Sequence, residues 1–270
     1  MHGLVAGDNA IPGWERHEGD SPLIAVALHS GHLVPLELAN LMAVTEEERL
    51  REEDPYTGEW TVAVPNRLVV RRSRFLCDLN QPHHKAIYMA PEDAWGLEVW
   101  EKTPPVELER ELRAYHDAFY VEVKRWFDRI ESQWGRFVVL DLHAYNHRRS
   151  GPDAPPAPAE ENPDVNIGTG TMDRNLWGPL VDRFIRDLKA FDCLGRKLDV
   201  RENVRFTGGE FPNWVHRNYP TSGCVISVDI KKIFMDEWTG MLYPVAFDAY
   251  ARALRAVVPG ILEELEEMRP

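Results

Sequence analysis

The sequence predicts an α/β fold, with a mixed, mainly parallel central sheet flanked by helices in three layers (α/β/α). The first observation is a continuous apolar run at residues 23–28, which is typical of a strand buried on both faces. The second is the stretch 106–134, in which apolar residues recur every three or four positions, as on one face of a helix. A further apolar strand pattern follows at 137–142, and strand, helix and strand in this order indicate parallel pairing.

Shorter patterns predict the remaining elements. Thr45, with Glu48 three positions later, has the pattern of a capping box that opens a short acidic helix. Residues 67–70 and 75–79 form apolar pieces for which we expect two adjacent strands. The segment 150–163 is rich in proline and alanine, so we expect a mobile loop and a candidate lid. Three later elements complete the prediction, namely helices near 178–191 and 244–268 and a strand at 225–230.

Length and composition favour one globular domain over residues 1–270. The chain is 44% hydrophobic and shows neither an internal repeat nor a break in composition. Its formal net charge of −13 disfavours nucleic acid and anionic membrane surfaces as partners.

Cysteine usage and targeting signals point to a reduced, cytoplasmic protein. Cys77, Cys193 and Cys224 are odd in number and widely spaced, which does not suggest a disulfide framework. The first 20 residues lack the charged start and apolar run of a secretory signal. No apolar stretch approaches the length of a membrane span.

Two histidines follow apolar strand patterns directly and form a candidate metal site. His29 comes after the run 23–28, and His143 comes after the run 137–142. The carboxyl ends of neighbouring parallel strands meet at one edge of a sheet, where α/β proteins bind their ligands. Each histidine could instead be a satisfied polar group at a strand end. Asp141, two residues before His143, is expected to point to the opposite face of the strand and to support the sheet or a neighbouring loop.

A hydrolytic zinc site needs about three protein ligands and one position open to water. We favour Asp54 as the third ligand, because it lies in a turn-forming segment after the acidic helix. His32 and Glu37 remain alternatives. The H-x-x-H pair of His29 and His32 lies on a predicted loop and lacks the fixed geometry of a helical pair.

Several short motifs in one order resemble a known family. They are HSGHLVP, DPYTGEW, SRFLCDLNQ, DLHAY, NIGT and TGG. In this order and approximate spacing, over roughly residues 22–240, the chain resembles the N-formylglutamate amidohydrolases. The resemblance implies a phosphorylase/hydrolase-like fold related to the zinc carboxypeptidases, and hydrolysis of an N-acyl amide of an acidic amino acid. It also implies that His29, Asp54 and His143 hold one zinc ion per chain.

The resemblance further suggests how the substrate is held. In the related carboxypeptidases a D-L-N-R segment binds the substrate carboxylate, and the similar D-L-N-Q segment here implies that Asn80 and Gln81 contact the amino-acid half. Gln81 stands where the arginine is expected and cannot form a charge-assisted bidentate contact. Arg74 is a candidate for holding the substrate carboxylate or the developing oxyanion. Its alternative is a solvated arginine at a strand edge.

The resemblance leaves two candidates for the general base. Family members carry a glutamate on a late strand, in a segment similar to 225–230, and this chain has Asp229 there. Glu210 competes with it, because it directly follows a T-G-G turn in which the main chain can approach a ligand. Ala144 stands where the family usually has a serine, so the identity of the substrate stays open.

We therefore expect a zinc-dependent hydrolase that uses activated water to cleave the amide bond of an N-acyl amino acid or peptide. The expected partner is that small substrate. A non-catalytic binding protein on the same fold and a peptide-directed hydrolase are the alternatives. A serine hydrolase is disfavoured, because the sequence contains no G-x-S-x-G motif.

Overall fold

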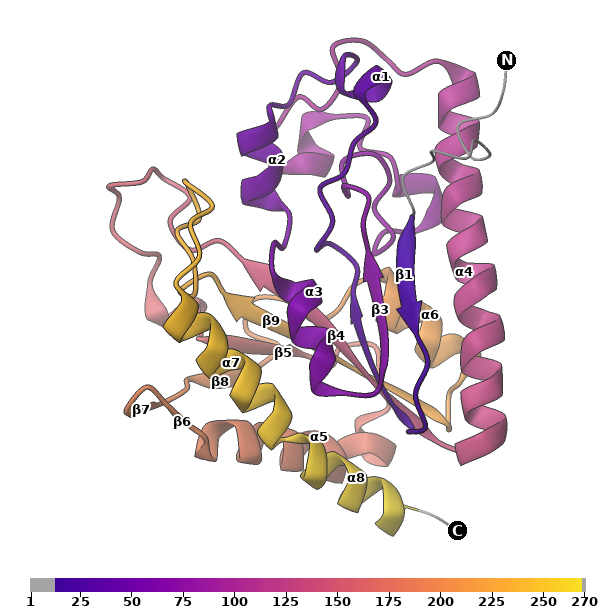
Figure 1. Cartoon of the computed structure of the whole chain (residues 1–270), viewed down its shortest axis with the longest axis vertical. Coiled ribbons are helices and arrows are strands. Elements are labelled where there is room, and N and C mark those ends of the chain that lie inside the picture. Colours follow the sequence, from indigo (N-terminus) through magenta and orange to yellow (C-terminus); the bar gives the residue numbers. More distant parts are fainter. Residues whose placement is uncertain (1–12, 269–270) are drawn as a thin grey trace.

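A single seven-stranded sheet forms the centre of the protein (Figure 1). The computed structural model describes residues 13–268, so most of the N-terminal segment inspected for a secretory signal lies outside the described residues. In sheet order the strands are β1 (Trp14–His17), β3 (Asn66–Val70), β2 (Leu23–Ala27), β4 (Phe137–Tyr145), β9 (Gly223–Lys231), β5 (Val165–Gly168) and β8 (Val200–Glu202).

The sheet is mixed, and its centre is parallel. Strands β3, β2, β4 and β9 run parallel to one another. Strand β1 is antiparallel to β3, β5 is antiparallel to β9, and β8 is parallel to β5. The pairing confirms the predicted mixed, mainly parallel sheet. A separate two-stranded hairpin is formed by β6 (Asp192–Cys193) and β7 (Arg196–Lys197).

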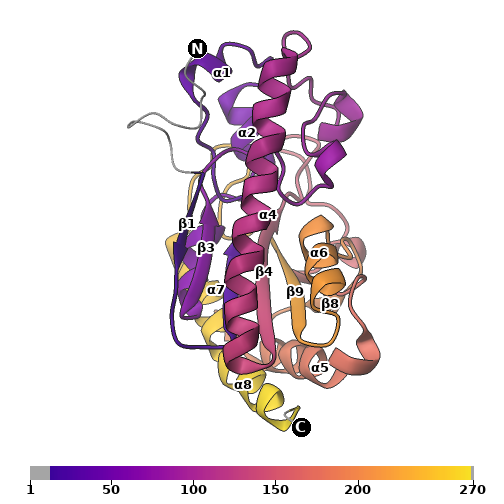
Figure 2. The same ribbon diagram turned by 90° about the vertical axis from the view of Figure 1, so that its right-hand side faces the viewer.

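Helices cover both faces of the sheet, which gives the predicted three layers (Figure 2). One face carries α4 (Val106–Trp134) and α6 (Glu210–Asn218), and the other carries α5 (Arg174–Ala190), α7 (Pro244–Ala256) and α8 (Val258–Glu267). Alternate residues of each central strand point to opposite faces. In β2, Ile24 and Val26 therefore pack toward α4, whereas Leu23 and Ala25 pack into the core on the opposite face.

Most of the short helices occur in the N-terminal half of the chain, in the segments that connect its strands. They are α1 (Leu36–Ala39), α2 (Glu46–Glu52) and α3 (Thr57–Trp60), with 3-10 turns at Thr61–Ala63, His83–Lys85, Pro91–Ala94 and Ala159–Glu161. Thr45 and Glu48 form the predicted capping box at the start of α2. Gly135, at φ 76°, ends α4, as its left-handed conformation favours glycine.

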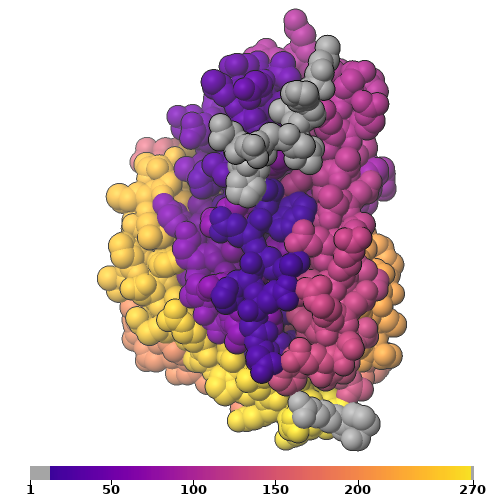
Figure 3. Space-filling model, turned by 45° about the vertical axis from the view of Figure 1, so that its right-hand side comes forward, coloured from indigo at the N-terminus to yellow at the C-terminus, as the bar shows by residue number. Residues whose placement is uncertain are grey.

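Strand β1 is an edge strand that the sequence analysis did not predict. It lies beside α4 on one face of the molecule (Figure 3), where the Trp14 ring stands 5.3 Å from the rings of Tyr115 and Phe119. Three of its four residues are exposed, so its sequence carries no apolar run. The short strands β5 and β8 were missed for lack of length.

Three predicted elements differ from the structure. Residues 75–79 form no strand: Leu76 N donates to Ser73 O in a turn, and the apolar side chains enter the core from that turn. The helix expected near 178–191 begins at Arg174, because Asp173 caps it. The stretch expected as one helix over 244–268 is two, and Pro259 near the start of α8 has no N–H to continue the hydrogen bonding of α7.

Cys77, Cys193 and Cys224 are all buried and form no disulfide. Within residues 13–268, no helix combines the length and the apolarity that crossing a membrane requires.

Candidate metal centre

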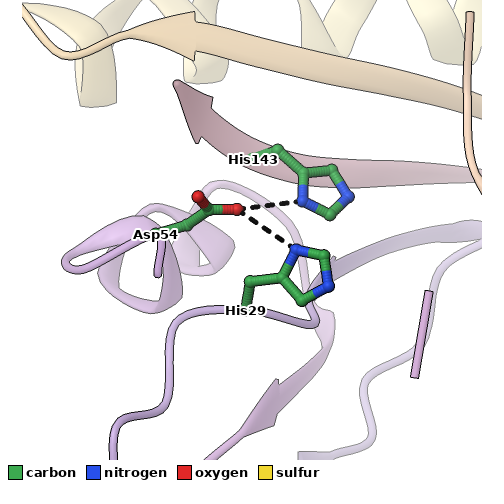
Figure 4. A group of neighbouring side chains, drawn as sticks. All are labelled: His29, Asp54 and His143. Atoms are coloured by element: carbon green, nitrogen blue, oxygen red, sulfur yellow. Dashed lines mark hydrogen bonds and ion pairs between the residues drawn. The ribbon is translucent and has the colours of Figure 1, made fainter. Parts of the chain in front are cut away.

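The structure brings His29, Asp54 and His143 together at the carboxyl ends of β2 and β4. The Oδ2 atom of Asp54 lies 3.4 Å from Nδ1 of His29 and 3.0 Å from Nδ1 of His143. One potential ligand atom from each residue lies within 4.8 Å of the other two. Figure 4 shows both rings turned toward the same carboxylate oxygen. All three side chains are buried, so this group forms a compact candidate metal centre.

Main-chain hydrogen bonds place Asp54 beside His29. Asp54 N donates to His29 O at 2.9 Å, which holds the end of the α2 segment against the end of β2. Thr57 N and Oγ1 donate to Asp54 O and close the turn that follows. Lys232, just beyond β9, donates through Nζ to the carbonyls of Arg51 and Glu53 at 2.6 and 2.7 Å. The turn that carries Asp54 is therefore anchored from two separate strands.

Gly31, two residues after His29, lies where the main chain passes close to Arg71. A Cβ atom at this position would overlap the main chain of Arg71, so the two segments pass too closely for any side chain. The glycine of the H-S-G motif is therefore a requirement of close main-chain packing beside the site.

A second layer of carboxylates contacts the far side of each ring. Asp78 Oδ1 lies 2.8 Å from His29 Nε2, and Asp141 Oδ1 lies 3.0 Å from His143 Nε2. The first contact is a hydrogen bond, whereas the second is a close approach without good hydrogen-bond alignment. A carboxylate beside Nε2 favours a proton there and leaves the Nδ1 lone pair free to bind a metal.

The prediction for Asp141 was wrong. Residues two apart in a strand point to the same face, so Asp141 and His143 share the face that carries the site. Ser227 Oγ donates to the other carboxylate oxygen of Asp141 at 3.3 Å.

The charge and donor set fit a divalent cation. His29 Nδ1 is buried and, among the described residues, has no hydrogen-bond partner. Burial lowers the pKa of His143, but Asp141 and Asp54 outweigh it and hold that pKa well above its ordinary value. Burial raises the pKa of Asp54, yet the hydrogen bond with His143 and the nearby His29 ring bring that pKa below its ordinary value. An orphaned ring nitrogen beside ionised carboxylates is the environment that a bound metal ion would stabilise.

Arg74 lies part-buried in the wall of the site rather than solvated at a strand edge. Its Nη2 lies 2.6 Å from Asp78 Oδ2, which also accepts a hydrogen bond from Tyr88, and its guanidinium lies 4.7 Å from the centre of the Trp95 ring. Burial raises the pKa of Asp78, but Arg74 and His29 hold it well below its ordinary value. The ionised Asp78 thus links Arg74 to the candidate ligand His29.

A cavity of about 370 Å³ opens over the three residues. It is lined by polar and charged side chains from both halves of the sheet. Besides His29, Asp54 and His143 its wall includes Glu52, Arg74, Asn80, Gln81, Trp95, Ala144, Asn146, Arg149, Arg205, Thr207, Ser227, Asp229 and Lys232.

Asp229 enters this cavity from β9, directly opposite His143 in the β4–β9 register. Asn166 Nδ2 donates to its Oδ2 at 3.0 Å. Burial raises the pKa of the Asp229 carboxyl to about 6, although His143 opposes this shift. Asp229 is thus a buried carboxylate held by a neighbouring amide at the edge of the candidate metal centre.

Other sequence candidates lie elsewhere. His32 and Glu37 are exposed and do not line the cavity. The Glu210 carboxylate is bound by Arg217 at 2.5 Å and by Asn213 at 3.1 Å, and it faces a different hollow between α4 and α6. None of residues 150–163, the candidate lid, belongs to the cavity wall.

Sequence reasoning assigned no role at the site to four residues. Asp78 lies in the motif D-L-N-Q and Asn166 in the motif N-I-G-T. Both motifs support the family resemblance, but the sequence alone assigns neither residue a function. The two-residue period of a strand would have placed Asp141 beside His143. Lys232 carries no local signal, because its partners are main-chain carbonyls distant in sequence.

The sheet and the cavity together define the class of protein. It is an α/β protein with a candidate metal centre, formed by His29, Asp54 and His143, at the carboxyl ends of its parallel strands. The chain belongs to the N-formylglutamate amidohydrolase family, whose sequence model matches residues 21–233. Membership confirms the family resemblance and supports a hydrolase that acts on a small amide substrate.

Two solved structures show the same fold. An N-formylglutamate amidohydrolase from Ralstonia eutropha JMP134 is 19% identical with a TM-score of 0.75, over 95% of this chain and 99% of that chain. A gene product of Agrobacterium tumefaciens is 17% identical with a TM-score of 0.59, over 94% of this chain and 96% of that chain. A metallo-carboxypeptidase from Burkholderia cenocepacia is 14% identical with a TM-score of 0.36, over 90% of this chain and 56% of that chain. The search of curated proteins found no match.

Proposed function

We propose that the protein is a zinc-dependent amidohydrolase that cleaves the amide bond of an N-acyl amino acid or peptide. The observation that carries the proposal is the convergence of His29 Nδ1, His143 Nδ1 and Asp54 Oδ2 in the cavity floor, with a carboxylate beside each Nε2. Two imidazoles, one carboxylate and a side open to the cavity make the donor set typical of catalytic zinc.

His29, Asp54 and His143 would hold the ion, and Asp78 and Asp141 would keep the two rings in orientation. When bound, zinc supplies Lewis acidity and brings the pKa of water toward neutrality.

Asp229 acts as the general base in this proposal. Its carboxylate takes a proton from the attacking water and returns it to the leaving amine nitrogen, so no net proton stays on the protein. Asn166 holds the carboxylate in place through Oδ2. Asp229 is preferred over Glu210, because Glu210 lies outside the cavity and is bound to Arg217.

Arg74, Asn80 and Gln81 orient the substrate. Arg74 spends Nε and Nη2 on Asp78, and its remaining Nη1 makes only a long contact, 3.5 Å to Glu52 O, so it can donate to a carbonyl oxygen that gains charge. Asn80 accepts from the main-chain N–H groups of Glu210 and Phe211, which leaves its amide N–H groups free to donate. Gln81 adds a neutral amide to the same wall.

Metal content and turnover together test this function. We expect about one zinc per chain in the parent protein and in His84→Ala, an exposed histidine control, and loss of zinc in His29→Ala and His143→Ala. The zinc-loaded parent should release free amine from N-formyl or N-acetyl amino acids. Metal that survives both substitutions would overturn the metal centre. Zinc binding without turnover of any N-acyl amino acid or peptide would favour a binding protein on this fold.

A further inference from the structure

Arg205 lies in the segment between β8 and α6 and faces the cavity. Its guanidinium carbon lies 5.4 Å from the ring centre of Tyr145 and 5.5 Å from that of Phe206. The Nε atom is buried and has no hydrogen-bond partner among the described residues. The side chain thus lies beside two aromatic rings, and the fold does not use its Nε–H donor.

The other cations of the cavity are already engaged. Arg74 is paired with Asp78 at 2.6 Å. Arg149 forms a bidentate pair with Glu52 at 2.7 and 3.1 Å. Lys232 donates to two main-chain carbonyls at the end of α2. Among the cationic residues of the described cavity wall, this leaves one guanidinium without a carboxylate partner.

The main chain that carries Arg205 is fastened to the proposed general base. Asn166 Oδ1 accepts from Val204 N at 3.0 Å and from Arg205 N at 2.9 Å. Its Nδ2 donates to Phe206 O at 2.8 Å and to Asp229 Oδ2 at 3.0 Å. One buried amide therefore sets the spacing between this arginine and the reacting end of the cavity.

The same segment also packs against the predicted substrate-binding wall. A Cβ atom at Gly209 would overlap the side chain of Asn80, so the loop and the D-L-N-Q segment are in close contact. Gln81 in that wall is neutral, and a carboxylate bound there needs a cation from elsewhere. Arg205 is placed on the adjoining segment to supply it.

We propose that Arg205 determines specificity by binding a free carboxylate of the substrate, which restricts the substrate class to N-acyl amino acids that carry that carboxylate. The inference rests on the proposed function, because it assigns a role within the same cavity. A guanidinium forms two parallel hydrogen bonds to a carboxylate, a geometry that a neutral amide of the same shape cannot match. The carboxylate is either the α-carboxylate or one on the substrate side chain.

Three ligands distinguish the α-carboxylate from the side-chain carboxylate as the group that Arg205 binds. They are N-acetylglutamate, its α-amide, and N-acetylglutamine, which lacks only the side-chain carboxylate. Binding is measured by calorimetry on the zinc-loaded protein in an Asp229→Asn background, so that turnover is not required. Arg205→Met should weaken N-acetylglutamate binding about 10- to 100-fold. Of the two amide ligands, the one that lacks the carboxylate bound by Arg205 should have the same affinity for the Asp229→Asn protein with and without Arg205→Met.

The controls keep the result specific. Arg186→Met removes an exposed arginine on α5 and should leave all three affinities unchanged. Arg205→Lys keeps the charge without the bidentate geometry and should lose only several-fold, which tests the role even if Arg205→Met fails to fold. Equal affinity for N-acetylglutamate in the parent and in both Arg205 variants would overturn the inference.

The experiment distinguishes failure of the carboxylate site from failure of the proposed reaction. Binding that depends on Arg205, in a protein whose Asp229-containing parent never turns substrate over, would contradict the hydrolase but retain the carboxylate site. Turnover in a protein whose acid-over-amide preference survives Arg205→Met would retain the hydrolase and overturn the carboxylate site.

Discussion

Asp78 Oδ1 lies 2.8 Å from His29 Nε2, on the ring nitrogen that faces away from Asp54. Both side chains are buried, and Asp78 is held in turn by Arg74 and Tyr88. The arrangement directs the His29 Nδ1 lone pair into the cavity and ties the orientation of the ring to a charged network behind it.

Asp78→Asn should weaken zinc binding about 10- to 100-fold, because the amide no longer presents a negative charge to His29 Nε2. Asp153→Asn, in an exposed loop, serves as the control. The measurement is a competition titration with a zinc chelator. The substitution also removes the charged partner of the part-buried Arg74, at a cost of up to about 3 kcal/mol, so urea unfolding is measured on the same samples. Unchanged zinc affinity in folded Asp78→Asn would contradict the orienting role.

Lys232→Met should loosen the turn that carries Asp54, since it removes two hydrogen bonds to the carbonyls of Arg51 and Glu53. We expect zinc affinity to fall about 10-fold while the fold is retained. Lys231→Met is a matched control on the same strand end, because Lys231 contacts Asn162 and Asp164 instead. Equal losses in the two variants would show that the anchoring of Asp54 is not the cause.

Asp229→Asn should lower kcat about 100- to 10,000-fold without loss of zinc, because the amide cannot accept the proton from water. Asp229→Glu keeps the carboxylate and should recover part of the activity. Steady-state kinetics and metal analysis on the same preparations separate the two effects. If Asp229→Asn retained parent activity, a different group would have to be the base.

His216 should make stability depend on pH. Its Nε2 accepts from Val225 N at 3.0 Å, its Nδ1 contacts Thr171 Oγ1 at 2.8 Å, and burial lowers its pKa to about 4. As the pH falls from about 6.5 to 4, this histidine is protonated in the unfolded chain before it is protonated in the folded protein. The free energy of unfolding therefore decreases over this range, by up to about 3 kcal/mol, from its value above pH 6.5.

The check is urea unfolding of the parent and His216→Gln between pH 7.5 and 4.5. The difference in unfolding free energy between them should shrink as the pH falls, because only the parent loses this contribution. His84→Gln, an exposed control, should follow the parent. A difference that stays constant over this range would contradict the assignment.

Long periodic elements could be predicted from the sequence, and short or edge elements could not. Helix α4 was predicted with both ends, and β2, β4 and β9 within a few residues, because each carries a continuous or strictly periodic apolar pattern. Strand β1 exposes most of its residues, and residues 75–79 are apolar although they form a turn. Burial, rather than strand pairing, accounts for the apolar character of that turn.

The candidate metal centre was predicted in part. His29 and His143 follow from their positions at strand ends, a local property of the chain. Asp54 was favoured over His32 and Glu37 by turn chemistry alone, and those two residues prove to be exposed and outside the cavity. The position of Asp54 beside the two histidines depends on contacts that no local pattern contains, such as the hydrogen bond from Asp54 N to His29 O.

Local patterning therefore accounts for the central strands, the long helix and the two histidines, since hydrophobic period and strand ends are written into neighbouring residues. The partners of those histidines come from distant segments. Asp78 and Lys232 meet the site because buried charges must find partners wherever the folded chain provides them. Arg205 faces the cavity because Asn166 fastens its segment there. Such pairings depend on packing between segments far apart in the chain, and they exist only once the sheet has assembled.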